Sequence, residues 1–164
     1  VAMRRLIREG KPVLHEVRAS ELVRRALRHC GGAVRERANL RVANVPELSV
    51  QAAEPLAVQV LSAVLRNAAA ASPDGQTGAV DVEVRAGGDS VAFVVTDDGP
   101  GVPDDVAALM FELHMWQRPE GVGAGLAIAA YALRVQGGAI TYRRAPGRGA
   151  CFTVTLPHAR RTNS

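Results

Sequence analysis

A short acidic and glycine-rich run follows the most regular alternation of apolar residues in the chain. Residues 97–101 read DDGPG and come directly after the alternating stretch 90–96. Asp97 continues the inward-facing positions of that stretch, so we expect its carboxylate to point into the protein. A buried carboxylate is costly unless it accepts hydrogen bonds, and the amino group of adenine is a suitable donor. The alternative is a simple turn, because Asp and Gly are common turn residues.

An asparagine lies within an apolar helical pattern. At 100° per residue, Asn67 shares a helix face with Leu56, Val60, Ala63, Val64 and Ala71. A buried amide must be hydrogen-bonded or lose about 1–3 kcal/mol. Asn67 either bonds nearby backbone or serves as an oxygen ligand of a hard cation such as Mg²⁺.

The third pattern is glycine-rich and precedes a helix. Residues 121–126 read GVGAGL, and glycines let a backbone approach phosphate groups, which the free N–H groups of a helix start attract. A dinucleotide-binding fold would need a strand before this run, and residues 115–120 do not form a strand pattern. The phosphate-loop ending in Gly-Lys-Ser/Thr is absent as well.

Helices and strands are both expected around these residues. After the end of a helix in 1–9 and an extended piece over 12–18, the patterns predict helices over 20–37, 55–71, 103–110 and 124–136. Strands are predicted over 39–45, 48–52, 79–85, 90–96, 139–143 and 150–156. Ser20 is expected to cap the first long helix. The elements do not alternate as βαβ units, which favours an α+β two-layer sandwich, with a mixed sheet of about five strands covered on one face by three helices.

Composition excludes several classes of function. The chain has 164 residues, 48% of them hydrophobic, which suits one packed domain, and no apolar run approaches the roughly 20 residues that cross a bilayer. The net charge of +4 comes from arginines spread along the chain, with 4% aromatic residues to stack bases, so nucleic-acid binding is not expected. Cys30 and Cys151 are expected to be thiols of a reducing compartment. The start at Val1 suggests a fragment of a longer protein, cytoplasmic itself but with a parent that can be membrane-anchored.

The order of these motifs resembles the GHKL ATP-binding fold, above all the catalytic domain of sensor histidine kinases. The motifs are the asparagine, the D-x-G-x-G run, a short lid with a phenylalanine, and G-x-G-x-G-L. The resemblance covers residues 11–157, leaving 1–10 as the end of a dimerisation helix and 158–164 as a tail. FELHMWQRPEGVGAGLAI and the opening LIREGKPVLHEVRASELVRRAL are similar to the nitrogen-regulation class. The resemblance implies that Asn67 holds Mg²⁺ and Asp97 binds the adenine of ATP. It assigns further nucleotide contacts to Gly99, Gly101, Phe111, Gly121, Gly123, Gly125 and Leu126.

Three departures from the family pattern bear on activity. Ala63 stands four residues before Asn67, where the ATPase branches have a glutamate that activates water, so hydrolysis is disfavoured. Arg118 replaces the lid lysine and is expected to meet the γ-phosphate as a catalytic cation. His114 replaces the second lid phenylalanine, which puts the lid's hold on the nucleotide in doubt. His15 precedes a glutamate as a phosphoacceptor does, but it follows Pro12 in an extended piece and is interpreted as structural.

The resemblance therefore implies transfer of the γ-phosphoryl group of ATP to a histidine outside this chain. The implied partners are the phosphoacceptor and dimerisation domain of the same kinase and a downstream response regulator. The domain alone is expected to be monomeric and its parent homodimeric. Two alternatives stay open: a GHKL ATPase or serine kinase, and a degenerate nucleotide-sensing or scaffolding module.

Overall fold

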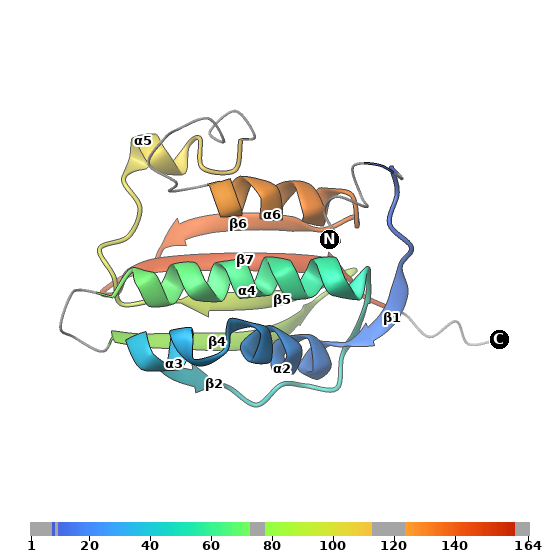
Figure 1. Cartoon of the computed structure of the whole chain (residues 1–164), viewed down its shortest axis with the longest axis horizontal. Coiled ribbons are helices and arrows are strands. Elements are labelled where there is room, and N and C mark those ends of the chain that lie inside the picture. The colour runs from blue at the N-terminus through green and yellow to red at the C-terminus, as the bar shows by residue number, and fades with distance from the viewer. Residues whose placement is uncertain (1–7, 9, 73–77, 113–123, 160–164) are drawn as a thin grey trace.

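The computed structural model describes residues 8, 10–72, 78–112 and 124–159. Its elements in chain order are β1 (His15–Arg18), α2 (Ala19–Cys30), α3 (Gly32–Arg37), β2 (Ala38–Val42), β3 (Ser49–Ala52), α4 (Glu54–Ala70), β4 (Gly78–Gly87), β5 (Ser90–Thr96), α5 (Asp104–Ala107), α6 (Ala124–Arg134), β6 (Ala139–Arg144) and β7 (Ala150–Pro157). Figure 1 shows these elements along the whole chain. None of the described helices is long and apolar enough to cross a membrane.

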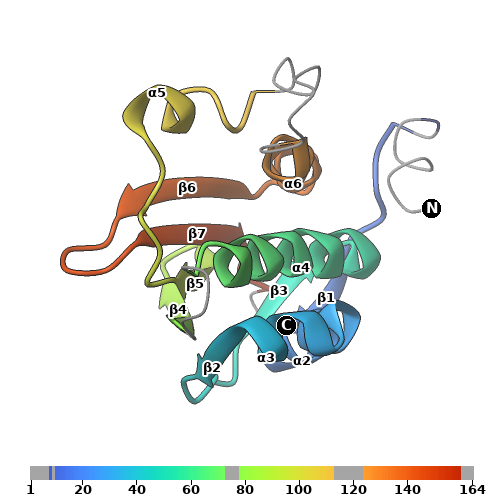
Figure 2. The same ribbon diagram turned by 60° about the vertical axis from the view of Figure 1, so that its left-hand side comes forward.

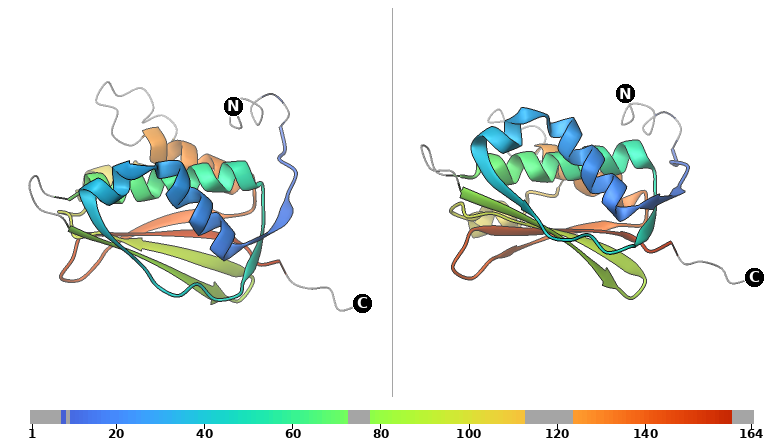
Figure 3. Two further views of the ribbon diagram at one scale, coloured as in Figure 1. Left: turned by 60° about the horizontal axis from the view of Figure 1, so that its bottom comes forward. Right: turned by 90° about the horizontal axis from the view of Figure 1, so that it is seen from below.

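The main sheet has five strands in the order β2-β4-β5-β7-β6. β2 runs parallel to β4, and the other neighbouring strands are antiparallel, so the sheet is mixed. Helices α2, α4 and α6 lie together on one face, as the two views of Figure 3 show. This arrangement confirms the predicted α+β sandwich, and a separate two-stranded antiparallel sheet of β1 and β3 adds to it.

Alternation along the strands produces the core. In β5, Val91, Phe93 and Val95 are almost fully buried beneath the helices, and β7 buries Phe152 and Val154 in the same layer. Because successive side chains of a strand point to opposite faces, these positions form one apolar surface. The helices cover that surface with their own apolar stripes, and hydrophobic burial holds the two layers together.

The helix predicted over 20–37 is in fact two helices. Gly31 separates α2 from α3 with φ +61° and ψ −144°, and its N–H donates to the carbonyl of Arg28 at 3.0 Å. A residue with a Cβ atom rarely adopts a positive φ, so the break falls at a glycine. The predicted cap was also wrong, since α2 begins at Ala19 and Ser20 lies inside its first turn.

Two buried polar side chains fix α4 against its neighbours. The amide of Gln136, 1% exposed, accepts a hydrogen bond from the N–H of Ala53 at 2.8 Å, just before α4, and donates to the carbonyl of Ala132 in α6. Ser62 of α4 donates to the carbonyl of Val58 at 2.6 Å and lies 3.3 Å from the carbonyl of Ala26 in α2. The helices that carry Asn67 and the glycine-rich run are therefore held in a fixed relation.

Candidate functional site

Asp97 is a buried acid at the end of the central strand β5. It is 1% exposed, and its Oδ1 accepts hydrogen bonds from the N–H groups of Gly99 at 2.9 Å and Ala150 at 3.0 Å. Its Oδ2 is also buried and has no hydrogen-bond partner among the described residues. Burial raises the pKa of Asp97, and the two N–H donors oppose that rise. A buried acceptor without a donor costs about 1–3 kcal/mol, so a ligand that donates to Oδ2 is favoured.

The neighbouring acid, Asp98, has a different environment. Its exposed carboxylate accepts from Nε of Arg148 at 2.6 Å and from the N–H of Ala79 at 2.9 Å. Arg148 also pairs with Asp81, which in turn pairs with Arg41 on β2. The Arg148 hydrogen bond is the main reason that the pKa of Asp98 is lowered. Asp97 thus keeps one oxygen without a donor among the described residues, whereas Asp98 links the start of β4 to the β6–β7 hairpin through Arg148. Asp81 and Arg41 extend this network to β2.

Two glycines follow these acids, one constrained by close packing and the other by its backbone angle. A Cβ atom at Gly99 would lie 2.5 Å from the carbonyl oxygen of Ala71, at the end of α4. Gly101 has φ +78°, and a Cβ atom there would lie 2.9 Å from Nη1 of Arg144. The backbone at Gly99 therefore approaches the end of α4 more closely than a larger residue permits, whereas Gly101 is favoured by its positive φ.

Asn67 lies near the C-terminal end of α4 and is half-buried. Asn67 lies at the edge of the buried face of α4 and not in its middle. Val60 and Val64 are fully buried, whereas Ala63 and Asn67 are half-exposed. The side chains of Ala63 and Asn67 are therefore partly exposed on this side of α4, and Gly99 packs against Ala71, one turn beyond Asn67. The amide oxygen can ligate a cation there.

The predicted lid is described only at its two ends. Phe111 is half-buried and packs edge-on against the buried ring of Phe152, with ring centroids 6.4 Å apart. Gly125 is exposed in the first turn of α6, and Leu126 is buried in the main core. Arg118, His114, Gly121 and Gly123 lie outside the described residues.

Sequence reasoning missed the residues that support Asp97 from β7. The N–H of Gly149 donates to the Asp97 carbonyl at 2.9 Å, and the N–H of Ala150 donates to its carboxylate. The G-x-G spacing of Gly147 and Gly149 was the only signal for this contact, and it fits an ordinary hairpin equally well. His15, in contrast, lies exposed in β1 and not on a helix, as predicted.

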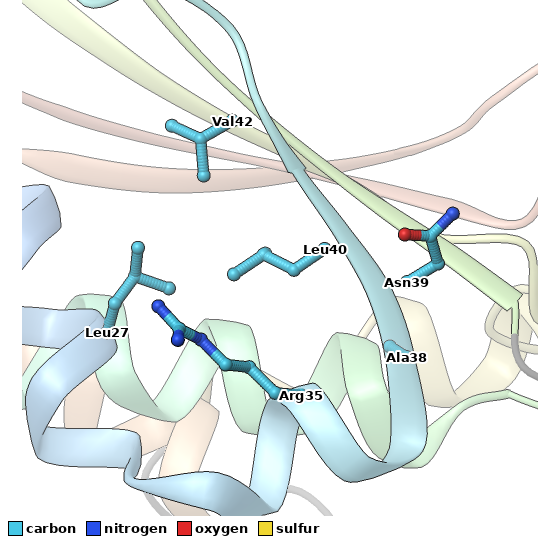
Figure 4. A pocket seen from close by; sticks show the side chains of 6 residues that line it. All are labelled: Leu27, Arg35, Ala38, Asn39, Leu40 and Val42. Carbon is cyan, nitrogen blue, oxygen red and sulfur yellow. The ribbon is translucent and has the colours of Figure 1, made fainter.

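A separate open hollow of about 800 Å³ lies at the β2 edge of the sheet. In Figure 4 the side chains of Leu27, Arg35 and Leu40 point toward a common space, while the amide of Asn39 points away. None of the predicted nucleotide contacts lines this hollow, and β2 lies at the edge of the sheet whereas Asp97 follows a central strand.

Comparison with known proteins assigns the chain to a family. The profile described as "Histidine kinase-, DNA gyrase B-, and HSP90-like ATPase" matches residues 52–160. The C4-dicarboxylate transport sensor protein DctS of Rhodobacter capsulatus is 33% identical over 157 residues, which are 92% of this chain and 24% of DctS. The sensor histidine kinase ZraS of Salmonella typhimurium is 36% identical over 84 residues, 51% of this chain and 18% of ZraS. The chain thus spans about a quarter or less of these relatives.

Solved structures agree with this assignment. The mycobacterial sensor histidine kinase MprB matches with a TM-score of 0.74 and 29% identity, covering 89% of this chain and 98% of that one. Full-length ShkA, solved in complex with AMPPNP, matches with a TM-score of 0.73 and 28% identity over 91% of this chain and 32% of its own. With the buried acid, its glycine loop and this sandwich, the chain belongs to the histidine kinase-, DNA gyrase B- and HSP90-like ATPase family, in the branch of the sensor histidine kinases.

Proposed function

We propose that this chain is the ATP-binding catalytic domain of a sensor histidine kinase that transfers the γ-phosphoryl group of ATP to a histidine outside the chain. The observation that carries the proposal is the buried Oδ2 of Asp97, an acceptor without a donor among the described residues. The exocyclic amino group of adenine supplies that donor. In this proposal residues 11–157 form the catalytic domain, 1–10 end a dimerisation helix and 158–164 are a tail.

Each residue of the site has a distinct part in the proposed reaction. Asp97 selects the base, and Gly99 and Gly101 let the loop pass close to it. The Asn67 amide would hold Mg²⁺, which neutralises phosphate charge when bound. Arg118 would bring a guanidinium to the transferring group, an interaction that is strongest in the transition state. Catalysis in this scheme is positioning and charge neutralisation, so no covalent nucleophile is needed.

Partners follow from the same proposal. The phosphoacceptor is a histidine of the dimerisation domain of the parent kinase, and a response regulator receives the phosphoryl group afterwards. His15, exposed in β1, is not the acceptor. The similarity to the nitrogen-regulation class stays a prediction. It rests on residues 111–128, of which 113–123 lie outside the described residues, and on the sequence of the opening residues 6–27.

Calorimetric titration with ADP and ATP, with and without Mg²⁺, tests the proposal. The unsubstituted domain should bind both nucleotides. Asp97→Asn should weaken binding at least roughly tenfold, about 1.4 kcal/mol, while the domain stays folded. Asp105→Asn, an exposed aspartate of α5, is the matched control and should bind as the parent does. A parent that binds neither nucleotide would instead favour the scaffolding alternative.

A phosphotransfer assay then separates kinase from ATPase. The isolated domain should not label itself from radioactive ATP, and adding the matching dimerisation domain in trans should give an acid-labile phosphohistidine. Arg118→Ala should leave ADP affinity nearly unchanged and slow transfer at least roughly tenfold. Acid-labile phosphate on His15 would contradict the assignment of the acceptor.

A further inference from the structure

Two side chains of the edge strand β6 hold the loop that follows Asp97. The hydroxyl of Tyr142 accepts a hydrogen bond from the N–H of Val102 at 3.0 Å and lies 3.4 Å from the carbonyl of the same residue. Two positions along, Nη1 of Arg144 donates to the carbonyl of Pro100 at 3.0 Å. The loop is thus bonded to β6 through its own backbone groups. We call Tyr142 and Arg144 the β6 clamp.

Strand register places the clamp in line with Asp97. Arg144 pairs across the ladder with Ala150, whose N–H donates to Oδ1 of Asp97, and Tyr142 pairs with Phe152. Directly paired residues have their side chains on the same face of a sheet, and alternate residues of a strand share a face. The clamp therefore faces the helix layer, as Asp97 does, and Figure 2 shows the segment that bears α5 passing beside β6.

The loop is fixed at both ends. At its start the N–H of Gly99 is bonded to Oδ1 of Asp97, and at its end Val102 is bonded to Tyr142. Between them Gly101 has φ +78° and lies against the Arg144 guanidinium. A shift of the loop away from β6 would pull the Gly99 N–H from Oδ1 and let the carboxylate rotate.

We propose that Tyr142 and Arg144 are positioning residues for base recognition: they keep the loop in place so that Oδ2 of Asp97 stays aimed at the amino group of adenine. This inference rests on the proposed function, since it concerns the same site. The clamp acts through the loop and makes no contact with the nucleotide. Holding an unbound site in its binding geometry raises affinity because less ordering is required on binding.

Tyr142→Phe is the sharpest test. It removes the hydroxyl and keeps the ring, which lies 5.3 Å from the ring of Phe152, so the core is preserved. Loss of one hydrogen bond that orders the loop should lower ADP affinity about fivefold, equivalent to about 1 kcal/mol. Tyr131→Phe is the matched control, because Tyr131 is half-buried in α6 beside Leu56 and away from the loop.

Inosine diphosphate provides the readout that a merely structural role would not change. It carries a carbonyl oxygen where ADP has the amino group, so it has no donor for Oδ2 at that position. In Tyr142→Phe the preference for ADP over inosine diphosphate should fall about fivefold, with inosine diphosphate affinity nearly unchanged. Hydrogen exchange of the Val102 N–H should also become faster in the nucleotide-free variant.

Arg144 gives an independent second variant. Arg144→Ala should reduce the same preference, and Arg144→Lys, which keeps a donor for the Pro100 carbonyl, should restore part of it. Arg143→Ala is the control, since Arg143 is the exposed neighbouring residue on the opposite face of β6.

The outcomes separate the clamp from the proposed function. The inference is supported if the unsubstituted domain prefers ADP over inosine diphosphate, and if this preference falls in both clamp variants but persists in both control variants. An unchanged preference in folded Tyr142→Phe and Arg144→Ala, or an equal loss for both nucleotides, overturns it and leaves the proposed function intact. A parent that binds no adenine nucleotide overturns both.

Discussion

Gly149 and Asp97 are in contact across the ends of β5 and β7. The N–H of Gly149 donates to the Asp97 carbonyl at 2.9 Å, and a Cβ atom at Gly149 would lie less than 3.0 Å from Oδ1 of Asp97 and from the Gly99 backbone. Real Cβ atoms essentially never approach other atoms so closely. The carboxylate, the loop and the hairpin therefore share a space that has no room for one more carbon.

Gly149→Ala is expected to displace Asp97 or the loop. Overpacking of this kind costs about 1–3 kcal/mol of stability, and ADP affinity should fall at least roughly tenfold. Thermal unfolding and calorimetric titration measure the two effects. Gly147→Ala is the control in the same hairpin: its φ of +70° strains the backbone, but its Cβ atom would meet nothing within 4 Å, so binding should persist. Parent-like ADP binding by Gly149→Ala would contradict the shared space.

Asp97→Asn should change how stability depends on pH. Burial raises the pKa of Asp97 above its ordinary value of 3.8, so its stabilising contribution is complete below that value and is lost as the pH rises through the raised pKa. The uncharged variant lacks this loss, so its melting temperature should gain on that of the unsubstituted domain as the pH rises above about 4. ADP binding by the parent should weaken as the pH falls through the same pKa, because a protonated Oδ2 no longer accepts. Melting temperatures of the two proteins that stay parallel as the pH rises above about 4 would show that the pKa of Asp97 is not raised.

Arg148→Ala should destabilise the domain with the opposite dependence. Arg148 pairs with both Asp98 and Asp81. It is the main cause of the lowered pKa of Asp98. At Asp81 the main cause of the lowered pKa is Arg41, and Arg148 contributes. Stability from lowered carboxyl pKa values is present above about pH 4 and is lost as the pH falls through them. We expect a loss of about 1–2 kcal/mol at neutral pH that shrinks in acid and in high salt. Arg85→Ala, which removes an exposed pair with Glu83, is the control and should cost about 0.5 kcal/mol or less.

Ala63 predicts a slow ATPase. Without a base one turn before Asn67, phosphate release from ATP by the unsubstituted domain should be very slow. Ala63→Glu should raise it at least roughly tenfold, below the roughly hundredfold that a well-placed general base supplies. Ala63→Gln matches the size without the base and should not. Ala63 is half-exposed, so α4 can carry the longer side chains. Fast, Asn67-dependent release by the parent would favour the ATPase alternative.

Local patterns predicted most of the fold. The expected strand 90–96 coincides with β5, and 79–85 lies within β4, because alternation depends on neighbouring residues alone. The patterns failed where a helix was interrupted. Buried positions continue from Ala26 and Cys30 in α2 to Val34 in α3, so the apolar spacing alone does not mark the break at Gly31. The helix predicted over 103–110 is limited to α5, and the one over 124–136 ends at Arg134.

The site was predictable only in part, for a physical reason. The burial of Asp97 follows from its parity in β5, which is local, and it is confirmed. The contacts of Gly149, Tyr142 and Arg144 depend on the register of β5 with β7 and of β7 with β6. Register is set by the packing of whole strands and by turn geometry, so no window of the sequence contains it.

The support of Asp97 by β7 bears on how the protein is made. Ala150 follows Asp97 by 53 residues. When Asp97 has just been added to the growing chain, β7, which supports it, has not yet been synthesised. Synthesis proceeds at about 5–20 residues per second, which leaves several seconds in which the carboxylate lacks its donor from β7. Pairing of β5 with β7 closes this long loop and belongs with the slower steps of folding. Nucleotide bound in the cell would therefore favour the last stage of maturation, and a chain that stalls before β7 would gain nothing from it.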